Sequence, residues 1–184
     1  MSEAEEVRNE ELEAERQARR RIALAQVRQY PDPVLRMRAN EVQEFDDDLR
    51  QLAERMTGLM NGAIGVGLAA NQVGVLQRMF VFQPSAEEEP RAMVNPEIVE
   101  RSDEIEVDDE GCLSMQGVLV PVERNLGVTI EARDLDGEEV RLELEGMSAR
   151  VVQHELDHLD GTLIIDRTTP DGRREALAVL RQAV

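Results

Sequence analysis

The chain has 184 residues, a hydrophobic content of 41% and a formal net charge of -18 at pH 7. This length suits one domain with an aliphatic core, and so acidic a chain should not bind DNA directly or lie on an anionic membrane, because both would repel it. A single cysteine excludes an internal disulfide, and we find no apolar run that could cross a bilayer and no signal peptide, so we expect a cytoplasmic protein.

Residues 1–28 carry many charges of both signs and almost no apolar stripe before Ile22. Glu15 and Arg19 are spaced for an ion pair along a helix. Because such a composition buries little apolar surface, we expect a dispensable extension that is either helical or disordered. A single folded domain is expected over residues 29–184.

The rest of the chain predicts helices separated by a run of short strands. Leucine and methionine recur at helical spacing over residues 46–61, which predicts an amphipathic helix. Short β-rich segments predict strands at residues 78–84, 91–100, 117–124, 126–134 and 138–146. Residues 134–139 predict a hairpin turn, a further helix is expected to start near Met147, and a last helix is expected from Pro170 after the capping residue Thr169. The prediction is an α+β fold in which short mixed or antiparallel strands pack around a central helix.

The two histidines of the chain, His154 and His158, lie four residues apart in the sequence HELDH. The predicted helix that carries them ends at Gly161, and its inward stripe holds both imidazoles. With Glu155 beside them they form the H-E-x-x-H pattern of metal-dependent hydrolases, in which the histidines bind a divalent cation and the glutamate takes a proton from its bound water. A buried histidine pair without a metal is the alternative.

A catalytic metal site needs a third protein ligand, and the chain has no third histidine. Cys112 is the remaining soft donor, although a lone cysteine is more often a small buried apolar residue. The glycine-rich segment at 62–74 lacks the spacing of a dinucleotide-binding loop and predicts a tight turn between a helix and a strand. Alternatively, Gly65 and Gly67 let the backbone approach a ligand, while Gln72 presents a carboxamide donor.

Three segments in this order resemble the signature motifs of peptide deformylases: GVGLAANQ at 65–72, EGCLS at 110–114 and HELDH at 154–158. The resemblance covers most of the chain after residue 28 and implies a deformylase-like catalytic domain at 29–184. Members of this family remove the formyl group from the N-terminal formylmethionine of nascent bacterial polypeptides. The resemblance therefore implies one divalent metal, Fe²⁺ before Zn²⁺, Ni²⁺ or Co²⁺, and formylmethionyl nascent peptides as substrates; contact with the ribosome is a further expectation.

The same resemblance implies a role for each motif residue. The implied metal ligands are Cys112, His154 and His158. The implied catalytic groups are Glu155 as general acid and base, with Gln72 and the backbone N–H of Leu113 as donors to the developing oxyanion. The implied ion pair behind the ligands is formed by Glu110 and Arg124. The implied pocket for the methionine side chain is formed by Val66, Gly67, Met147 and Val151, beside His154.

The chain departs from the family pattern at Gln116 and Asn125, where members commonly have proline. We expect both departures near the rim of the pocket, where they would affect affinity more than chemistry. Two other functions are considered: a zinc peptidase that shares only H-E-x-x-H, and an inactive deformylase-like binding module. Such peptidases usually take their third ligand downstream, but only 26 residues follow His158 and none is histidine. An inactive module should have lost a motif residue such as Gln72 or Cys112, and the chain retains both.

Overall fold

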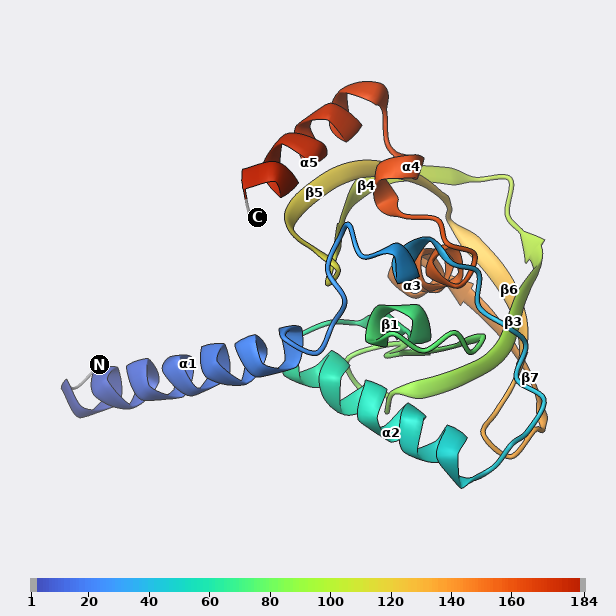
Figure 1. Ribbon diagram of the computed structural model, residues 1–184, viewed down its shortest axis with the longest axis horizontal. Helices are drawn as coiled ribbons and strands as arrows, with labels where there is room; N and C mark the ends of the chain where they lie inside the picture. The colour runs from blue at the N-terminus through green and yellow to red at the C-terminus, as the bar shows by residue number, and fades with distance from the viewer. Residues whose placement is uncertain (1–2, 183–184) are drawn as a thin grey trace.

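The strands of this chain curve around one helix, α3 (Gly146–Leu159), in the computed structural model, which describes residues 3–182 (Figure 1). Five strands form a sheet in the order β1-β2-β3-β6-β7, and β4 pairs with β5 in a separate ribbon. Every pairing between these strands is antiparallel. Their bounds are Gly67–Ala69 (β1), Met79–Phe82 (β2), Arg91–Arg101 (β3), Ile105–Cys112 (β4), Met115–Asn125 (β5), Gly127–Arg133 (β6) and Glu139–Glu145 (β7). The predicted α+β fold around a central helix is confirmed.

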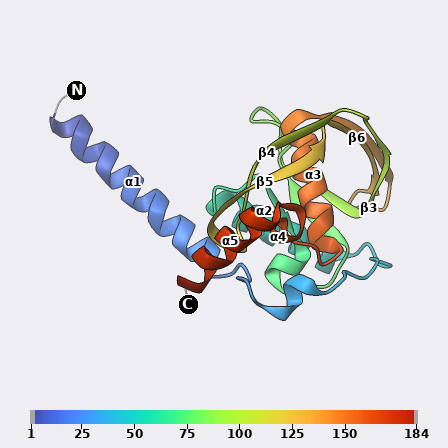
Figure 2. The ribbon, with the colours of Figure 1, turned by 90° about the horizontal axis from the view of Figure 1, so that it is seen from above.

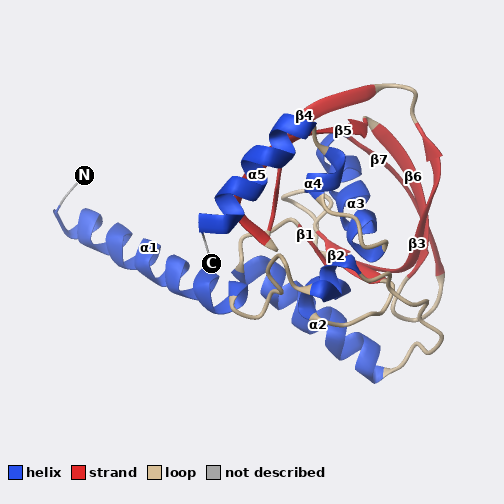
Figure 3. Cartoon of the chain, turned by 45° about the horizontal axis from the view of Figure 1, so that its top comes forward, coloured by secondary structure: helices blue, strands red, loops and turns tan. Residues whose placement is uncertain are grey.

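Other helices cover the outside of the strands, with α2 against β1 and β2, and α5 against β5 (Figure 3). Their bounds are Asp47–Gly62 (α2), Ile164–Arg167 (α4) and Pro170–Gln182 (α5), with short 3₁₀ helices at Pro33–Arg36 (η1) and Ala70–Val73 (η2). The helices predicted over residues 46–61 and from Pro170 are confirmed as α2 and α5. Asp46 caps α2 by accepting from the Leu49 N–H at 3.0 Å, and Thr169 Oγ1 accepts from the Gly172 N–H at 3.1 Å in α5.

The predicted strands correspond to β2, β3, β5, β6 and β7, and the predicted turn at 134–139 connects β6 to β7. Two strands were missing from the sequence prediction. β4 has the sequence IEVDDEGC, and its first five residues are exposed because it pairs only with β5. Its acidic, exposed side chains hide the apolar alternation by which strands are recognised. β1 has three residues, which is too short for a periodic pattern.

Helix α3 is buried from two sides, which fixes the position of its side chains. On the side of the sheet, Phe80, Phe82 and Ile130 pack in one cluster with Val152 and Leu159 of the helix. Its polar side is also buried, and the buried polar residues are Arg150, Gln153, Glu155, Asp157 and His158. A helix held in this way can present catalytic groups with little freedom to move.

Helix α1 (Glu3–Leu24) extends away from the body of the molecule (Figure 2). Of the two forms expected for the extension, helical or disordered, the structure has the helical one. Arg19 lies 3.5 Å from Glu15, as the spacing of the two residues predicts. Its end joins the core, since Ala23, Leu24 and Val27 are buried in one cluster with α2. The core thus includes residues that precede the boundary expected at residue 29. No helix in residues 3–182 is long and apolar enough to span a bilayer.

Candidate metal centre

The three expected ligands meet between α3 and the end of β4. His154 Nε2 and His158 Nε2 lie 3.2 Å apart, and Cys112 Sγ lies 3.3 Å from His158 Nε2. The three donor atoms all lie within 4.8 Å of one another. Around a tetrahedral zinc ion, with ligand distances of about 2.0 to 2.3 Å, neighbouring donor atoms are about 3.3 to 3.6 Å apart. The residues therefore fit one small divalent ion with a thiolate and two imidazoles as ligands.

The local sequence explains how the ligands converge. One helical turn separates the two histidines, so both imidazoles leave α3 on the same side. Cys112 is the last residue of β4, where the pairing with β5 shifts register between Glu110 and Cys112. This irregularity ends the ribbon next to the helix, so a residue more than 40 positions away in the sequence meets His158.

A buried ion-pair network orients His154. Glu110 Oε2 lies 3.1 Å from His154 Nδ1, and Arg124 donates to both Glu110 carboxylate oxygens at 2.9 Å. Burial by itself would raise the pKa of Glu110, but its hydrogen bonds to His154 and Arg124 lower the pKa to about 2. The carboxylate therefore stays ionised and holds the imidazole with Nε2 towards the other ligands, as carboxylates commonly do behind metal-binding histidines.

Two members of this network, Arg150 and Asp157, were absent from the sequence prediction. Arg150 Nη1 donates to Glu110 Oε1 at 2.9 Å, and Arg124 Nη1 donates to Asp157 Oδ2 at 2.6 Å. Both lie on α3 within four residues of a histidine, and both are at most 9% exposed. A charge on an otherwise inward-facing helix is the one sequence signal that could have indicated them.

The Glu155 carboxylate lies at the bottom of the site. It is 3% exposed, and its Oε2 has no hydrogen-bond partner among the described residues. Burial raises the pKa of Glu155 to about 7, which suits a group that must both accept and donate a proton near neutral pH. A Cβ at position 67 would collide with this carboxylate, so Gly67 is required for the close approach of β1 to α3.

Gln72 is held so that its carboxamide N–H₂ group faces the ligands. Gln72 Oε1 accepts from the Ala69 N–H at 2.9 Å, and Nε2 donates to Ser114 Oγ at 3.1 Å and lies 3.7 Å from Cys112 Sγ. Leu113 occupies the turn between β4 and β5, and its carbonyl accepts from Gln29 Nε2 at 2.9 Å. The glycine-rich segment and the cysteine segment thus meet at the metal ligands.

A cleft of about 390 Å³ opens beside these groups. All four expected pocket residues line it: Val66, Gly67, Met147 and Val151. Val66 and Met147 are exposed at the surface, whereas Val151 is buried. Gln116 also lines the cleft, as expected for a residue at the rim.

The expectation that Asn125 lies near this rim is wrong. Asn125 is at the end of β5 on the other side of α3, where its side chain donates to the Ser102 carbonyl and its backbone N–H donates to Gln153. It lines a second cavity, of about 870 Å³. Asn125 follows Arg124 directly in the sequence, and both residues line this second cavity and not the cleft.

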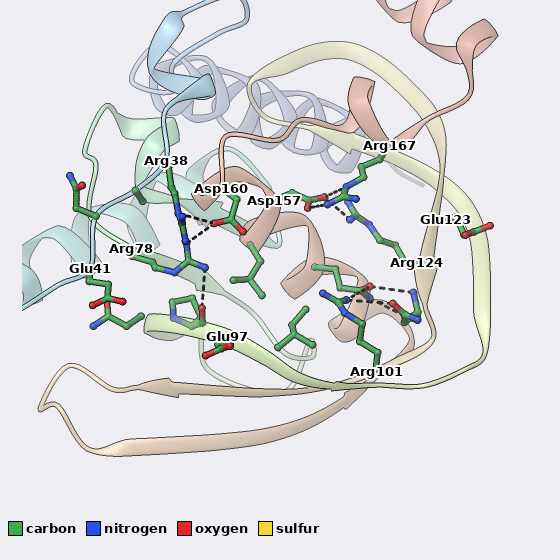
Figure 4. Close-up of a pocket in the computed structure, with 18 residues that line it drawn as sticks. Arg38, Glu41, Arg78, Glu97, Arg101, Glu123, Arg124, Asp157, Asp160 and Arg167 are labelled. Atoms are coloured by element: carbon green, nitrogen blue, oxygen red, sulfur yellow. Dashed lines mark hydrogen bonds and ion pairs between the residues drawn. The ribbon is translucent and has the colours of Figure 1, made fainter.

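Figure 4 shows this second cavity, in which the ion-pair network reaches the surface. Arg124 and Arg167 both bind the Asp157 carboxylate, and Arg78 Nη1 lies 2.8 Å from Asp160 Oδ1 (Figure 4). A chain of charged side chains therefore connects this surface, through Arg124 and Glu110, to His154 of the candidate metal centre.

Known proteins show the same combination of fold and motifs. The family model described as polypeptide deformylase matches residues 24–174. A peptide deformylase from Thermotoga sp. strain RQ2 is 49% identical over 147 residues, which cover 80% of this chain and 88% of the relative. One from Desulforudis audaxviator is 42% identical over 154 residues, which cover 84% of this chain and 99% of the relative.

Solved structures agree with the sequence relatives. The crystal structure of the Thermotoga maritima peptide deformylase has a TM-score of 0.75 and 49% identity, and the match covers 78% of this chain and 97% of that chain. The crystal structure of an Arabidopsis thaliana peptide deformylase 1B has a TM-score of 0.82 and 37% identity over 86% of this chain and 89% of that chain. With the family model covering most of the chain and relatives this similar over most of their own length, this chain belongs to the polypeptide deformylase family.

Proposed function

We propose that this chain is a metal-dependent hydrolase that removes the formyl group from the N-terminal formylmethionine of nascent polypeptides and releases formate. One observation carries the proposal: three soft donors converge beside a cleft that is lined by a buried carboxylate, Glu155, and an oriented carboxamide, Gln72. We further propose that the enzyme acts in the cytoplasm and meets its substrates as they leave the ribosome.

Cys112, His154 and His158 would hold the metal, which we propose to be Fe²⁺. A thiolate with two imidazoles also suits Zn²⁺, Ni²⁺ and Co²⁺, so the preference for iron rests on the family resemblance. When bound, the metal acts as a Lewis acid and makes water a nucleophile at neutral pH. The fixed orientation of His154 by Glu110 and Arg124 supports a site that forms before substrate enters.

The protein side chains and backbone supply proton transfer, oxyanion stabilisation and substrate binding. Glu155 accepts the proton of the attacking water and passes it to the nitrogen of the departing amine. The Gln72 carboxamide and the Leu113 N–H donate hydrogen bonds to the carbonyl oxygen as it becomes negative, and each such donor is worth about 3 kcal/mol in the transition state. Gly67 lets the peptide approach Glu155, and the methionine side chain enters the pocket of Val66, Met147 and Val151.

The decisive experiment compares two substrates that differ by one methyl group. Residues 65–67 and 112–113 line the cleft from two loops, so we expect the site to admit a formyl group and exclude an acetyl group. We expect formyl-Met-Ala-Ser to be hydrolysed with release of formate and acetyl-Met-Ala-Ser to be cleaved far more slowly. Comparable kcat/KM values, or cleavage at an internal peptide bond, would favour the zinc peptidase, and no hydrolysis by metal-loaded protein would favour the inactive binding module.

Metal content is measured on the same samples. Cys112→Ala removes the thiolate, so we expect this variant to lose stoichiometric metal in elemental analysis. Alanine is smaller than cysteine, so the local fold should be kept. If the metal is iron, activity should decay in air and persist longer after nickel substitution, because a thiolate-bound ferrous site is prone to oxidation. Retention of one metal per chain by Cys112→Ala would remove this residue from the ligand set.

A further inference from the structure

Helix α1 contributes one residue to the cleft beside the metal ligands. Arg20 lines this cleft together with the motif residues, and it is half-buried there. It precedes residue 24, where the match to the family model begins. The cleft of this chain therefore contains a cation that the family motifs do not supply.

Arg20 has no carboxylate partner on its own helix. The residues three and four positions away are Arg16, Gln17, Ala23 and Leu24, so no acid lies within reach along α1. The neighbouring Arg19 is different, because it pairs with Glu15 at 3.5 Å. Among the ion pairs between described residues, none includes Arg20.

Among the described residues that line the cleft, Arg20 is the one cation without an ion-pair partner. Arg150 is buried and held by Glu110 at 2.9 Å. Asp109 also lines the cleft, but it is exposed and forms no ion pair with Arg20. A ligand in the cleft would therefore meet a positive charge on the side of α1, in a chain whose net charge of -18 repels anions elsewhere.

A second hollow, which lies along α1, adjoins the cleft at one shared residue. Ile64, which is 48% exposed, lines both the cleft and a second hollow between α1 and α2. Leu12 and Arg16 of α1 line that hollow. A peptide whose first residue fills the pocket of Val151 thus has a path past Ile64 and Arg20.

We propose that Arg20 is a specificity-determining residue that binds a carboxylate of the substrate downstream of the formylmethionine. The enzyme then favours nascent chains with Asp or Glu close to their start. This inference rests on the proposed deformylase function, and it adds to that function a charge preference supplied by the N-terminal helix.

The test measures kcat/KM for a set of C-terminally amidated formyl-Met tetrapeptides, which lack a terminal carboxylate. Asp is placed in turn at positions two, three and four, and the reference peptide has Ala at all three. For an exposed ion pair we expect the wild-type enzyme to favour Asp at one position by about two- to fivefold. Arg20→Gln should abolish this preference, so that its Asp-to-Ala ratio of kcat/KM becomes about one. Arg20→Glu should instead favour Lys at the same position.

The matched control is Arg8→Gln, since Arg8 is exposed on the same helix and does not line the cleft. It should keep the Asp preference, and added salt should weaken that preference in the wild type, because screening acts on exposed charges. An equal Asp-to-Ala ratio in the wild type and in Arg20→Gln overturns the inference while the deformylase function stands. An equal loss on all peptides also overturns it, because α1 would then support the cleft without recognising charge. No hydrolysis of any formyl peptide by the metal-loaded wild type would contradict the proposed function itself.

Discussion

Helices α3 and α1 are both rich in charged residues, but α3 buries its charges and α1 leaves them in water. Arg150 and Asp157 of α3 are 6% and 9% exposed, whereas the side chains of Glu15 and Arg19 of α1 are 66% and 76% exposed. Two of the buried charges of α3 have partners on other elements: Arg150 binds Glu110 of β4, and Asp157 binds Arg124 of β5.

The difference follows from the cost of desolvating a charge. A buried charge without a partner is strongly destabilising, so the ion pairs of Arg150 and Asp157 hold the helix against the ribbon in one arrangement. An exposed pair such as Glu15 and Arg19 contributes little, since water and salt screen it. The paired charges of α3 therefore help to position His154 and His158, whereas we expect single exchanges of exposed charges on α1 to be tolerated. Among the described side chains of α1, Arg20 alone lines the cleft.

The largest expected effect concerns the chemistry on α3. Glu155→Gln keeps the size of the side chain but cannot accept a proton, so turnover of formyl-Met-Ala-Ser should fall by about 10²- to 10⁴-fold. Metal content should stay at the wild-type level, because Glu155 is not one of the three converging donors. Formate release and elemental analysis on one sample measure both. Near-normal turnover would exclude Glu155 from proton transfer.

The next effect compares a buried with an exposed arginine. In Arg124→Leu each carboxylate keeps one arginine partner: Glu110 keeps Arg150, and Asp157 keeps Arg167. We expect the free energy of unfolding to fall by about 3 kcal/mol, the lower end for breaking a buried pair. Arg19→Leu on α1 should cost less than about 1 kcal/mol. Urea unfolding of the two variants checks the comparison, and similar losses would refute it.

Apolar residues should show the same contrast. Leu159→Ala in α3 removes a fully buried side chain and should cost about 2 to 5 kcal/mol, whereas Leu12→Ala, at a position 55% exposed on α1, should change stability by less than about 0.5 kcal/mol. Leu24→Ala, at the buried end of α1, should resemble Leu159→Ala. A large loss for Leu12→Ala in urea unfolding would mean that the exposed part of α1 packs against the body.

The smallest effect is expected for truncation. Deletion of residues 1–18 removes exposed turns of α1, so the free energy of unfolding should change by less than about 0.5 kcal/mol. Hydrolysis of the neutral formyl peptide should also stay unchanged. A deletion that extends to residue 27 removes the buried side chains of Ala23, Leu24 and Val27 and should lower the melting temperature clearly in calorimetry. A lower melting temperature for the shorter deletion would show that the first turns of α1 also stabilise the body.

The helices and strands that have a clear local pattern could be predicted from the sequence. The spacing of leucine and methionine predicted α2, and alternating β-rich segments predicted five strands, because helical and strand periods are visible within about ten residues. The sequence also indicated the residues of the candidate metal centre, since the chain offers two histidines and one cysteine as soft donors, and the structure brings these three together. The roles proposed for Gln72 and Leu113 rest on the family motifs.

Which charges are buried, and which residues face the cleft, depends on contacts between distant parts of the chain. Arg124 meets Asp157 across 33 positions, Asn125 faces the cavity behind α3, and Arg20 reaches the cleft from a helix that looked like a solvated extension. Local patterns contain no information about such contacts, because an exposed charge and a buried, paired charge have the same sequence neighbours. The free energy that separates the two comes from partners supplied by distant strands and helices.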